Sequence, residues 1–543
     1  MRRALVLLDT DFDGARLHAA CAAHGGRRLH YIALAPRPVD ASHLPEEWRR
    51  QWPPCVPGQH RMVSRDGLVT LDVLAGDPEA CLAQLAARID AVHLAWVPAA
   101  VAVLARLMTD GGQLQAVHLD EAQRAALQGN GFVFDESRLR ATFYVRRGEH
   151  VAVAAPERRA IVIGAGVAGA AACERLAARG WKVTLIERHA QAASEASGHL
   201  AGIFMPQLSK DDNIATRLVR AAYLYSLRYW TDLGGIGAAF EGAQCGVLQL
   251  ARDGAHAQVQ RQIAASGMYP PEFARWLEAP EAAAMLGAPA PDGAWWFGQG
   301  GWARPSSVCA AMLDACGALL TRCFSSSALG LERVADEWLV RDAQGSLIAA
   351  APTVILAAGT GAVQFGQAAG LPLDAVRGQV THLAEGSLPS LPFVVCREAY
   401  MTPAHGGIVC VGASYDADAD ASVRAASQHD NIGKVAAILG VAPFEAPLAG
   451  RTGFRCVAPD RLPLAGALPD PGVPGRCERL REVPRWPGLH GLLGYASRGL
   501  IWAPLAAELL ACQLEGEPLP LERQLAEALD PARFLLRERR RAV

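Results

Sequence analysis

The sequence lacks the features that mark membrane proteins and disulfide-bonded secreted domains. No run of eighteen or more apolar residues occurs in its 543 residues, so no transmembrane helix is expected. The 13 cysteines are odd in number and never spaced as C-x-x-C, which argues against a zinc site or a disulfide framework. A formal charge of only −2 gives no overall attraction to nucleic acid or anionic lipid. We therefore expect a cytoplasmic, metal-free protein of roughly two to four domains.

Three of the cysteines, Cys309, Cys316 and Cys323, recur every seven residues. We interpret them as a stripe of small residues on one buried helix face, since helical spacing accounts for the period without a ligand.

A glycine-rich turn between two apolar strands is the strongest positive signal. An apolar strand over 158–163 leads into Gly164, Gly166 and Gly169, spaced as G-x-G-x-x-G, followed by an Ala-rich helix and a second strand ending at Glu187. The glycines permit a tight turn, backbone approach to a pyrophosphate and close helix packing, while the acid is placed to bind a ribose hydroxyl. The helix N-terminus adds free N–H groups for phosphates. This pattern predicts a cofactor that contains ADP.

Segments far apart in the sequence favour FAD over NAD. A Ser/Gly-rich stretch at 195–203 can pass over a flavin's diphosphate and ring, and the apolar strand 353–360 ends in small residues. The segment 494–501 begins an apolar helix whose N-terminus can face the flavin pyrimidine oxygen. NAD alone would not require all of these elements to converge. The residues expected at the cofactor are Gly164, Gly166, Gly169, Glu187, Arg188, Ser197, Gly198, Gly202, Gly359 and Gly499.

The chain is expected to divide near 148–157, where a charged stretch precedes the glycine motif. Before it, short strands at 3–9, 29–34, 68–74, 90–96 and 113–118 alternate with helical stretches such as 78–88, which indicates an α/β sheet. After it, alternating runs at 246–250, 379–383 and 407–413 suit an antiparallel substrate sheet. Five arginines within 533–541 predict a solvated basic tail or a phosphate contact.

Many further blocks occur in order along the chain, among them 164–169, 196–202, 206–212, 245–250, 300–302, 377–383, 400–403, 412–415, 453–456, 461–466 and 497–500. They resemble the glycine oxidase and D-amino acid oxidase class of flavoenzymes and, more closely and over almost the whole chain, the bifunctional tRNA 5-methylaminomethyl-2-thiouridine biosynthesis family, MnmC. The resemblance implies an α/β fold: a Rossmann-like methyltransferase remnant at 1–150, then a GR2-type FAD-binding domain at 158–530 with an inserted antiparallel substrate domain, and a tail at 531–543. The implied cofactor part covers about 158–245, 299–370 and 450–515, and the substrate part about 246–298 and 371–449.

The resemblance also implies a reaction and its residues. The C-terminal half of that family oxidises the carboxymethylaminomethyl side chain of the tRNA wobble uridine, releasing glyoxylate and leaving an aminomethyl group. A planar arginine fork suits the substrate carboxylate. Arg455 aligns with the carboxylate-binding arginine of the glycine oxidase class, and Arg498 is expected near flavin and substrate. Tyr400 and Tyr415 are expected as walls of the pocket, and no general base is assigned.

The N-terminal half departs from that family. Asp11 and Asp13 stand where glycines would let the backbone wrap S-adenosylmethionine (SAM), and Ala95-Trp-Val-Pro replaces the family's Asp-Gly-Phe-Ala-Pro. We therefore doubt SAM binding and expect a folded remnant without methyltransferase activity. A fully bifunctional enzyme, a free glycine or sarcosine-type oxidase, and a non-catalytic tRNA-binding or scaffold protein remain as alternatives.

Overall fold

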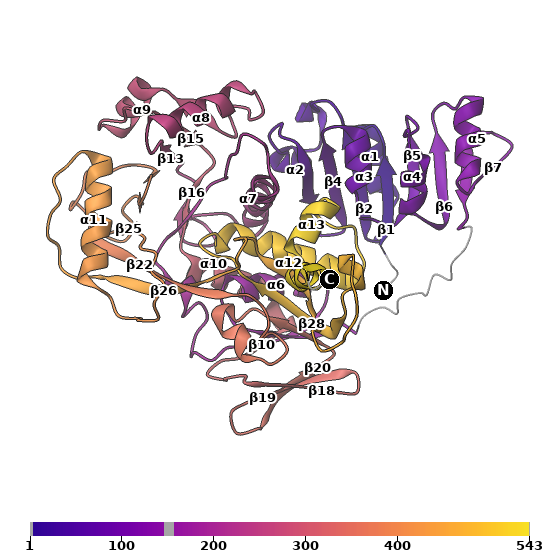
Figure 1. The fold of residues 1–543 in the computed structure, drawn as a ribbon. Coiled ribbons are helices and arrows are strands. Elements are labelled where there is room, and N and C mark those ends of the chain that lie inside the picture. Colours follow the sequence, from indigo (N-terminus) through magenta and orange to yellow (C-terminus); the bar gives the residue numbers. More distant parts are fainter. Residues whose placement is uncertain (1–3, 146–156, 542–543) are drawn as a thin grey trace. The chain divides into compact units, whose positions relative to one another are not determined.

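The computed structural model describes residues 4–145 and 157–541, and these fall into two units (Figure 1). The first unit takes in the chain up to Pro156 together with Leu509–Glu527, and the second takes in Glu157–Glu508 and the chain from Ala528 onward. The charged stretch expected at the boundary lies outside the described residues, except for its last residue, Glu157. Each unit is described separately below.

The first unit is built on one eight-stranded sheet in the order β3-β4-β2-β1-β5-β6-β8-β7. Its five inner strands are parallel: β1 (Leu5–Asp9), β2 (Leu29–Ala35), β4 (Val69–Ala75), β5 (Ile89–Leu94) and β6 (Met108–Ala116). They are the five strands predicted above. Antiparallel strands β3 (Gly58–Val63), β7 (Phe132–Phe134) and β8 (Arg140–Phe143) complete the edges. The helices are α1 (Gly14–Ala23), α2 (Glu46–Gln51), α3 (Pro78–Gln84), α4 (Val101–Leu107) and α5 (Glu121–Gly129).

The chain returns to the first unit near its end. Helix α12 (Gly499–Glu515) is grouped with the first unit from Leu509 onward, and α13 (Arg523–Leu529) begins there. The Leu519 N–H donates to the carbonyl of Ala86 at 3.0 Å, and the Gln59 amide donates to the carbonyl of Leu519 at 2.6 Å. The structure therefore differs from the expected oxidoreductase limits, because residues 509–527 pack on the N-terminal sheet.

In the second unit, a six-stranded sheet in the order β17-β10-β9-β21-β28-β27 carries the glycine motif. Its strands are β9 (Arg159–Ile163), β10 (Lys182–Ile186), β17 (Leu320–Cys323), β21 (Thr353–Leu356), β27 (Leu464–Pro469) and β28 (Arg485–Leu493), with only β27 antiparallel. Helices α6 (Val167–Ala177) and α10 (Pro305–Ala315) accompany it. Cys309 is buried on α10 and Cys316 caps that helix, but Cys323 ends β17. The prediction of one helix face is thus wrong for Cys323.

A second eight-stranded sheet in this unit runs β14-β15-β13-β23-β24-β25-β22-β26. The strands are β13 (Val247–Leu250), β14 (Arg275–Leu277), β15 (Ala294–Phe297), β22 (Asp374–Ala384), β23 (Val394–Cys396), β24 (Tyr400–Met401), β25 (Ile408–Gly412) and β26 (Gly450–Val457). All pairings are antiparallel except β13 with β23. Helix α11 (Ala425–Leu439) packs on β22 and β25 (Figure 1). β26 belongs to this sheet, whereas residues from 450 onward were expected in the cofactor part; eight backbone-paired residues of β22 fix it there.

Smaller elements complete the second unit. Two three-stranded sheets are formed by β11 (Gly202–Phe204), β12 (Gly242–Ala243) and β16 (Gly301–Ala303), and by β18 (Gly330–Val334), β19 (Glu337–Arg341) and β20 (Leu347–Ala351). The remaining helices are α7 (Ile214–Asp232), α8 (Gly254–Ala265), α9 (Ala279–Leu286) and α14 (Arg533–Arg541).

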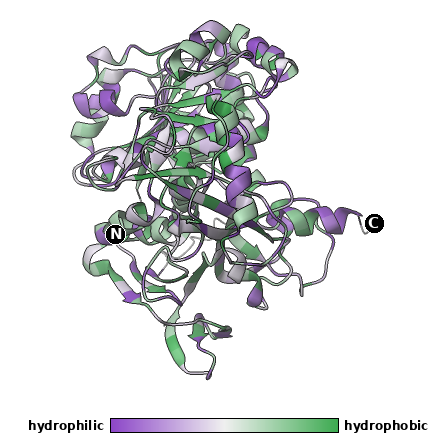
Figure 2. Ribbon diagram, turned by 90° about the vertical axis from the view of Figure 1, so that its left-hand side faces the viewer, coloured by the Kyte–Doolittle hydropathy of each residue, from purple (hydrophilic) through white to green (hydrophobic). Residues whose placement is uncertain are grey.

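Hydrophobic colour concentrates on the inner strands, while many outer helices carry hydrophilic residues (Figure 2).

The basic tail is not wholly a solvated end. Arg533, in α14, is buried, and its Nε lies 2.9 Å from Asp460 Oδ2. All 13 cysteines are free thiols. Across residues 4–145 and 157–541, no helix is both long and apolar enough to cross a membrane, and no group of three His, Cys, Asp or Glu side chains could hold a metal ion.

Candidate active site

A cavity of about 590 Å³ in the second unit gathers residues from both of its large sheets. Twelve of the fourteen site residues predicted from the sequence line it: Gly164, Gly166, Glu187, Arg188, Ser197, Gly202, Gly359, Tyr400, Tyr415, Arg455, Arg498 and Gly499. Gly169 and Gly198 are outside the lining. A cavity of this size, lined by both apolar and polar residues, is typical of a site for a large organic cofactor with an adjoining substrate.

The glycine turn leaves no room for side chains. Gly164 has φ +105°, and a Cβ there would lie 2.6 Å from the Ala357 carbonyl oxygen. A Cβ on Gly166 would lie 3.1 Å from Ser197 Oγ, at the N-terminus of α6. Gly169 serves packing instead, since its Cβ would lie 1.8 Å from the Gly164 carbonyl oxygen. The bare backbone at Gly164 and Gly166 forms a cradle that a phosphate can approach.

At the end of β10, Glu187 is held in a fixed orientation. Its two carboxylate oxygens accept the N–H groups of Ala165 at 2.8 Å and His189 at 2.9 Å. Each carboxylate oxygen can accept a second hydrogen bond, so a ribose hydroxyl can still be bound. Arg188 is exposed and pairs with Glu195.

The Ser/Gly-rich segment folds as a short 3-10 helix, η2 (Ala196–Gly198). Ser197 Oγ accepts the Val167 N–H at 3.1 Å and so caps the first turn of α6. Gly198 faces away from the cavity, because a Cβ there would lie 2.4 Å from Arg451 Nη2. Gly198 was predicted to lie at the cofactor, but in the structure it makes room for the Arg451 side chain.

Small residues and one arginine form a further part of the cavity lining. Gly359 has φ +54°, and Gly499 begins α12. The neighbouring Arg498 faces the cavity, and burial lowers the pKa of its guanidinium. Within the described part of the chain this cation has no hydrogen bond or ion pair from its side chain, so it needs an anion or a strong acceptor from a ligand.

These residues fit FAD. The glycine cradle can receive the diphosphate, Glu187 retains acceptor capacity for the ribose, and the Arg498–Gly499 corner offers positive charge to the ring. The donor set agrees with the cofactor expected from the sequence.

Arg455 enters the cavity from β26. Its Nη1 donates to two backbone carbonyls, that of Arg377 at 3.2 Å and that of Ser414 at 3.1 Å. Among the described residues it has no acidic partner. The two backbone carbonyls orient the guanidinium, and its positive charge is not neutralised. Gly378 on the paired strand makes this possible, because a Cβ there would lie 2.0 Å from Arg455 Nη1.

The two predicted tyrosines line the same end of the cavity in different ways. Tyr400, on β24, is half-buried, and burial raises the pKa of its hydroxyl, which keeps it a protonated donor. Tyr415 is 65% exposed, and its ring centre lies 4.1 Å from Arg455 Cζ. A guanidinium over an aromatic face is a favourable cation–π contact.

His199 also lines the cavity and was not predicted as a site residue. Burial and the nearby Arg455, Arg451 and His382 lower its pKa to about 3, so the ring is neutral at physiological pH. Its Nδ1 is buried and has no hydrogen-bond partner among the described residues. Its place within the Ser/Gly-rich segment was the sequence signal that could have drawn attention to it.

Comparisons with known proteins agree with this geometry. A family model described as FAD dependent oxidoreductase (DAO) matches residues 159–513. The chain is 42% identical over 549 residues to the tRNA 5-methylaminomethyl-2-thiouridine biosynthesis bifunctional protein MnmC of Azoarcus sp. (strain BH72), covering 97% of this chain and 86% of that protein. It is 40% identical to the MnmC protein of Paraburkholderia xenovorans (strain LB400), covering 91% of this chain and 81% of that protein.

Solved structures resemble the second unit. Iminodiacetate oxidase from Chelativorans sp. BNC1 is 25% identical with a TM-score of 0.56, covering 66% of this chain and 96% of that chain. Glycine oxidase from Geobacillus kaustophilus shares the fold at 21% identity and a TM-score of 0.57, covering 69% of this chain and 99% of that chain.

Proposed function

The chain belongs to the MnmC family and is an FAD-dependent oxidoreductase, and we propose that it oxidises the carboxymethylaminomethyl side chain of the tRNA wobble uridine. The products are glyoxylate and an aminomethyl-uridine. The proposal that tRNA is the substrate rests on the family, since the related proteins are named for tRNA 5-methylaminomethyl-2-thiouridine biosynthesis. The free thiols suit a reducing cytoplasm, where tRNA is found.

The oxidised group has the form R–CH2–NH–CH2–COO⁻. Bound FAD supplies the acceptor for a hydride from the carbon between the amine and the carboxylate. The amine loses its proton as the imine forms, and water then splits the imine into the aminomethyl product and glyoxylate. The role of the protein is to hold that carbon in the orientation needed for hydride transfer and to prevent other orientations of the bound substrate.

The observation that carries the proposal is the pair of unneutralised arginines. Arg455 and Arg498 both line the cavity, and neither has an acidic partner in the described chain. The Arg455 fork can bind the substrate carboxylate by two parallel hydrogen bonds. Neutral His199, beside Arg455, can accept a hydrogen bond from the substrate amine. A small amino acid would satisfy these groups as well, so the substrate must be tested directly.

We further propose that the first unit no longer transfers methyl groups. In a doubly wound sheet, ligands bind beyond the carboxyl ends of the strands where the strand order reverses, which here is between β1 and β5. At that point Trp96 Nε1 donates to the carbonyl of Thr10 at 2.8 Å, and Thr10 Oγ1 accepts the Ala95 N–H at 2.8 Å. The two loops that would surround a cofactor are thus bonded to each other.

The acid that ends β1 is also satisfied from within the protein. Asp9 Oδ2 accepts the Tyr31 hydroxyl at 2.7 Å and Arg16 Nε at 2.9 Å. Burial and Asp9 raise the pKa of Tyr31, which keeps it a donor. Asp13 is used as the N-cap of α1. An incoming SAM would have to break these contacts and approach the carboxylates of Asp11 and Asp13.

The oxidase proposal is tested by mixing the purified holoenzyme, without oxygen, with tRNA carrying carboxymethylaminomethyl-uridine, and separately with glycine and sarcosine. We expect flavin bleaching and glyoxylate release with the tRNA. Bleaching by the small amines alone would make the protein a free amine oxidase.

The methyltransferase proposal is tested by calorimetric titration of SAM into the holoenzyme. We expect no binding at SAM concentrations near one millimolar, and no methyl transfer to aminomethyl-uridine in tRNA. Saturable SAM binding would restore the fully bifunctional alternative.

A further inference from the structure

An exposed aromatic ring stands at the substrate end of the cavity. Tyr415 lines the cavity although its side chain is 65% exposed. One face of its ring is covered by the Arg455 guanidinium, whose Cζ lies 4.1 Å from the ring centre. A large exposed aromatic ring that is held in place on one face offers its other face to a flat ligand.

The backbone before Tyr415 is bonded to Arg455, and the backbone after it is bonded to Arg377, whose carbonyl also accepts Arg455 Nη1. Arg455 Nη1 donates to the carbonyl of Ser414, the residue before Tyr415, at 3.1 Å. The residue after it, Asp416, exchanges two backbone hydrogen bonds with Arg377, at 2.9 and 3.0 Å. The position of the ring is therefore coupled to that of Arg455.

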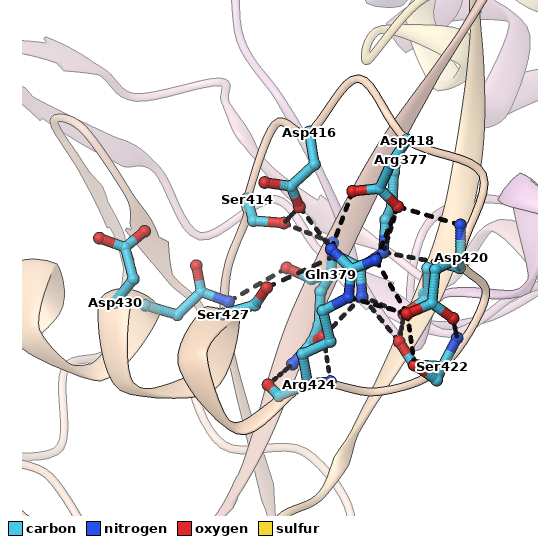
Figure 3. A network of polar contacts seen from close by, with 12 residues as sticks. Arg377, Gln379, Ser414, Asp416, Asp418, Asp420, Ser422, Arg424, Ser427 and Asp430 are labelled. Atoms are coloured by element: carbon cyan, nitrogen blue, oxygen red, sulfur yellow. Dashed lines mark hydrogen bonds and ion pairs between the residues drawn. The ribbon is translucent and has the colours of Figure 1, made fainter.

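The loop that carries Tyr415, residues 414–424 between β25 and α11, is organised around one buried cation (Figure 3). The Arg377 side chain is fully buried on β22. Its Nη1 lies 2.8 Å from Asp416 Oδ2, its Nε donates to the Asp420 carbonyl at 2.7 Å, and its Nη2 donates to the Ser422 carbonyl at 2.7 Å. Three points of the loop thus converge on one guanidinium.

Two of the acids of this loop, Asp418 and Asp420, are paired with an arginine of the same loop. Arg424 binds Asp418 through Nη1 at 2.8 Å and Nη2 at 2.7 Å, and its Nε donates to Asp420 at 2.9 Å. Gln379 holds the Arg424 backbone with hydrogen bonds at 2.8 and 2.9 Å (Figure 3). The aspartates therefore serve to order the loop, and what the ordered loop presents to the cavity is Tyr415.

We propose that Tyr415 is a stacking platform for the nucleobase of the substrate, and that Arg377 is the positioning residue that holds it. This inference rests on the proposed function, because only a substrate with a base can use the ring. Unpaired bases are commonly bound by stacking on aromatic side chains. With the base against Tyr415, its short arm reaches past the ring edge to Arg455 with the carboxylate foremost. The loop thereby selects an N-substituted glycine attached to a ring.

The platform is tested with Tyr415→Leu, Tyr415→Ala and Tyr415→Phe holoenzymes acting on tRNA that carries carboxymethylaminomethyl-uridine. We expect Leu and Ala to raise KM by about 5- to 150-fold, the range for losing one base–aromatic stack. Phe keeps the flat ring and should stay within about twofold of the wild type. Leu is the key comparison, because it is apolar but has no π-face. Tyr144→Leu, at a 52% exposed tyrosine of the first unit, is the matched control.

The role of Arg377 is tested by a double-mutant cycle. Arg377→Lys should raise KM on its own, but it should add little to Tyr415→Ala, because both remove the same platform. If the Arg377→Lys variant does not fold with bound flavin, Asp416→Asn gives the same test, because Asp416 is the ion-pair partner of Arg377. Fully additive effects would overturn the positioning role.

Failure of the inference can be distinguished from failure of the proposed function. A wild-type enzyme that releases no glyoxylate from tRNA refutes the proposed function and this inference with it. A wild type that is active on tRNA, with a Tyr415→Leu variant of unchanged KM, refutes the stacking platform alone.

Discussion

Arg455 and Arg498, which line the cavity, differ from the protein's buried arginines in what surrounds them. Arg377 is bound by an aspartate and several carbonyls, and Arg179 pairs with Glu508 at 2.9 Å. In the described chain, the Arg455 guanidinium donates to two backbone carbonyls and covers the Tyr415 ring, while Arg498 has no hydrogen bond or ion pair from its side chain. A desolvated cation without a counter-ion is costly, so these two positions gain most from an anionic ligand.

Arg455→Lys tests the value of the planar fork. Lysine keeps the charge but cannot donate to the Arg377 and Ser414 carbonyls and to a carboxylate in one fixed geometry. We expect kcat/KM for the modified tRNA to fall about 10- to 100-fold, as for a lost charged hydrogen bond. Glyoxylate release measures the effect. Arg275→Lys, at an exposed pair with Glu281, is the control and should be silent; an unaltered Arg455→Lys enzyme would remove this residue from substrate binding.

A pH effect on stability is expected from His490, which is half-buried on β28. Burial and Arg485 lower its pKa from the usual 6.5 to about 4. Below about pH 6.5 the unfolded chain therefore binds a proton that the folded protein takes up only near pH 4. This residue's contribution to the free energy of unfolding is fully present above pH 6.5 and is lost as the pH falls toward 4, by up to about 1.4 kcal/mol per pH unit.

Urea unfolding of wild type and His490→Asn at about pH 7.5 and 5 provides the measurement. The wild type should lose more stability between the two pH values than the variant, since asparagine does not titrate. Equal losses in both proteins would mean that His490 is protonated in the folded state.

Among the elements, the β22–β26 pair builds the substrate end of the cavity by leaving out side chains. Gly378 on β22 lies opposite Gly453 on β26. A Cβ on Gly378 would meet Arg455 Nη1 at 2.0 Å, and a Cβ on Gly453 would meet His199 Nε2 at 2.8 Å. Two glycines in register thus open space for one cation and one neutral imidazole at the same cavity.

Gly378→Ala should displace the Arg455 guanidinium while the sheet persists. We expect kcat/KM to fall at least as far as in Arg455→Lys, because the added methyl occupies the arginine's position. The flavin content should remain close to that of the wild type. Gly366→Ala, where a Cβ meets nothing within 4 Å and φ is not positive, is the matched control. Full activity of Gly378→Ala would show that Arg455 can bind substrate from another position.

For the whole molecule, the return of residues 509–527 to the first unit places part of its interior late in the sequence. Arg61 is fully buried and binds Asp72 at 2.7 Å. It also donates to the Pro518 carbonyl at 2.8 Å. The N-terminal sheet thus contains a buried ion pair whose hydrogen bonds are completed by the C-terminal segment.

Arg61→Met should destabilise the first unit by about 3–5 kcal/mol, because Asp72 would remain buried without its cation. The midpoint of the corresponding urea transition, followed by tryptophan fluorescence, measures the loss. Arg61→Met combined with Asp72→Leu removes both charges and should recover much of the stability. A single variant as stable as wild type would show that water reaches Asp72.

Local sequence determined the elements and the cofactor chemistry. The turn at Gly164–Gly169 and the acid at Glu187 could be placed because each depends on residues close in sequence. The five inner strands of the first unit were predicted for the same reason, since apolar runs between turns identify strands. The loss of glycines at Asp11 and Asp13 was visible in the sequence, and it motivates the proposed loss of methyl transfer.

Tertiary structure alone decided what faces the cavity. Gly198 lies in the segment predicted at the cofactor but makes room for Arg451, and His199 beside it lines the cavity instead. β26 joins the substrate sheet, Arg533 is buried against Asp460, and residues 509–527 pack on the N-terminal sheet. The Arg377 contacts join residues about forty positions apart. Such pairings depend on packing between distant segments, whose free energy no short stretch of sequence contains.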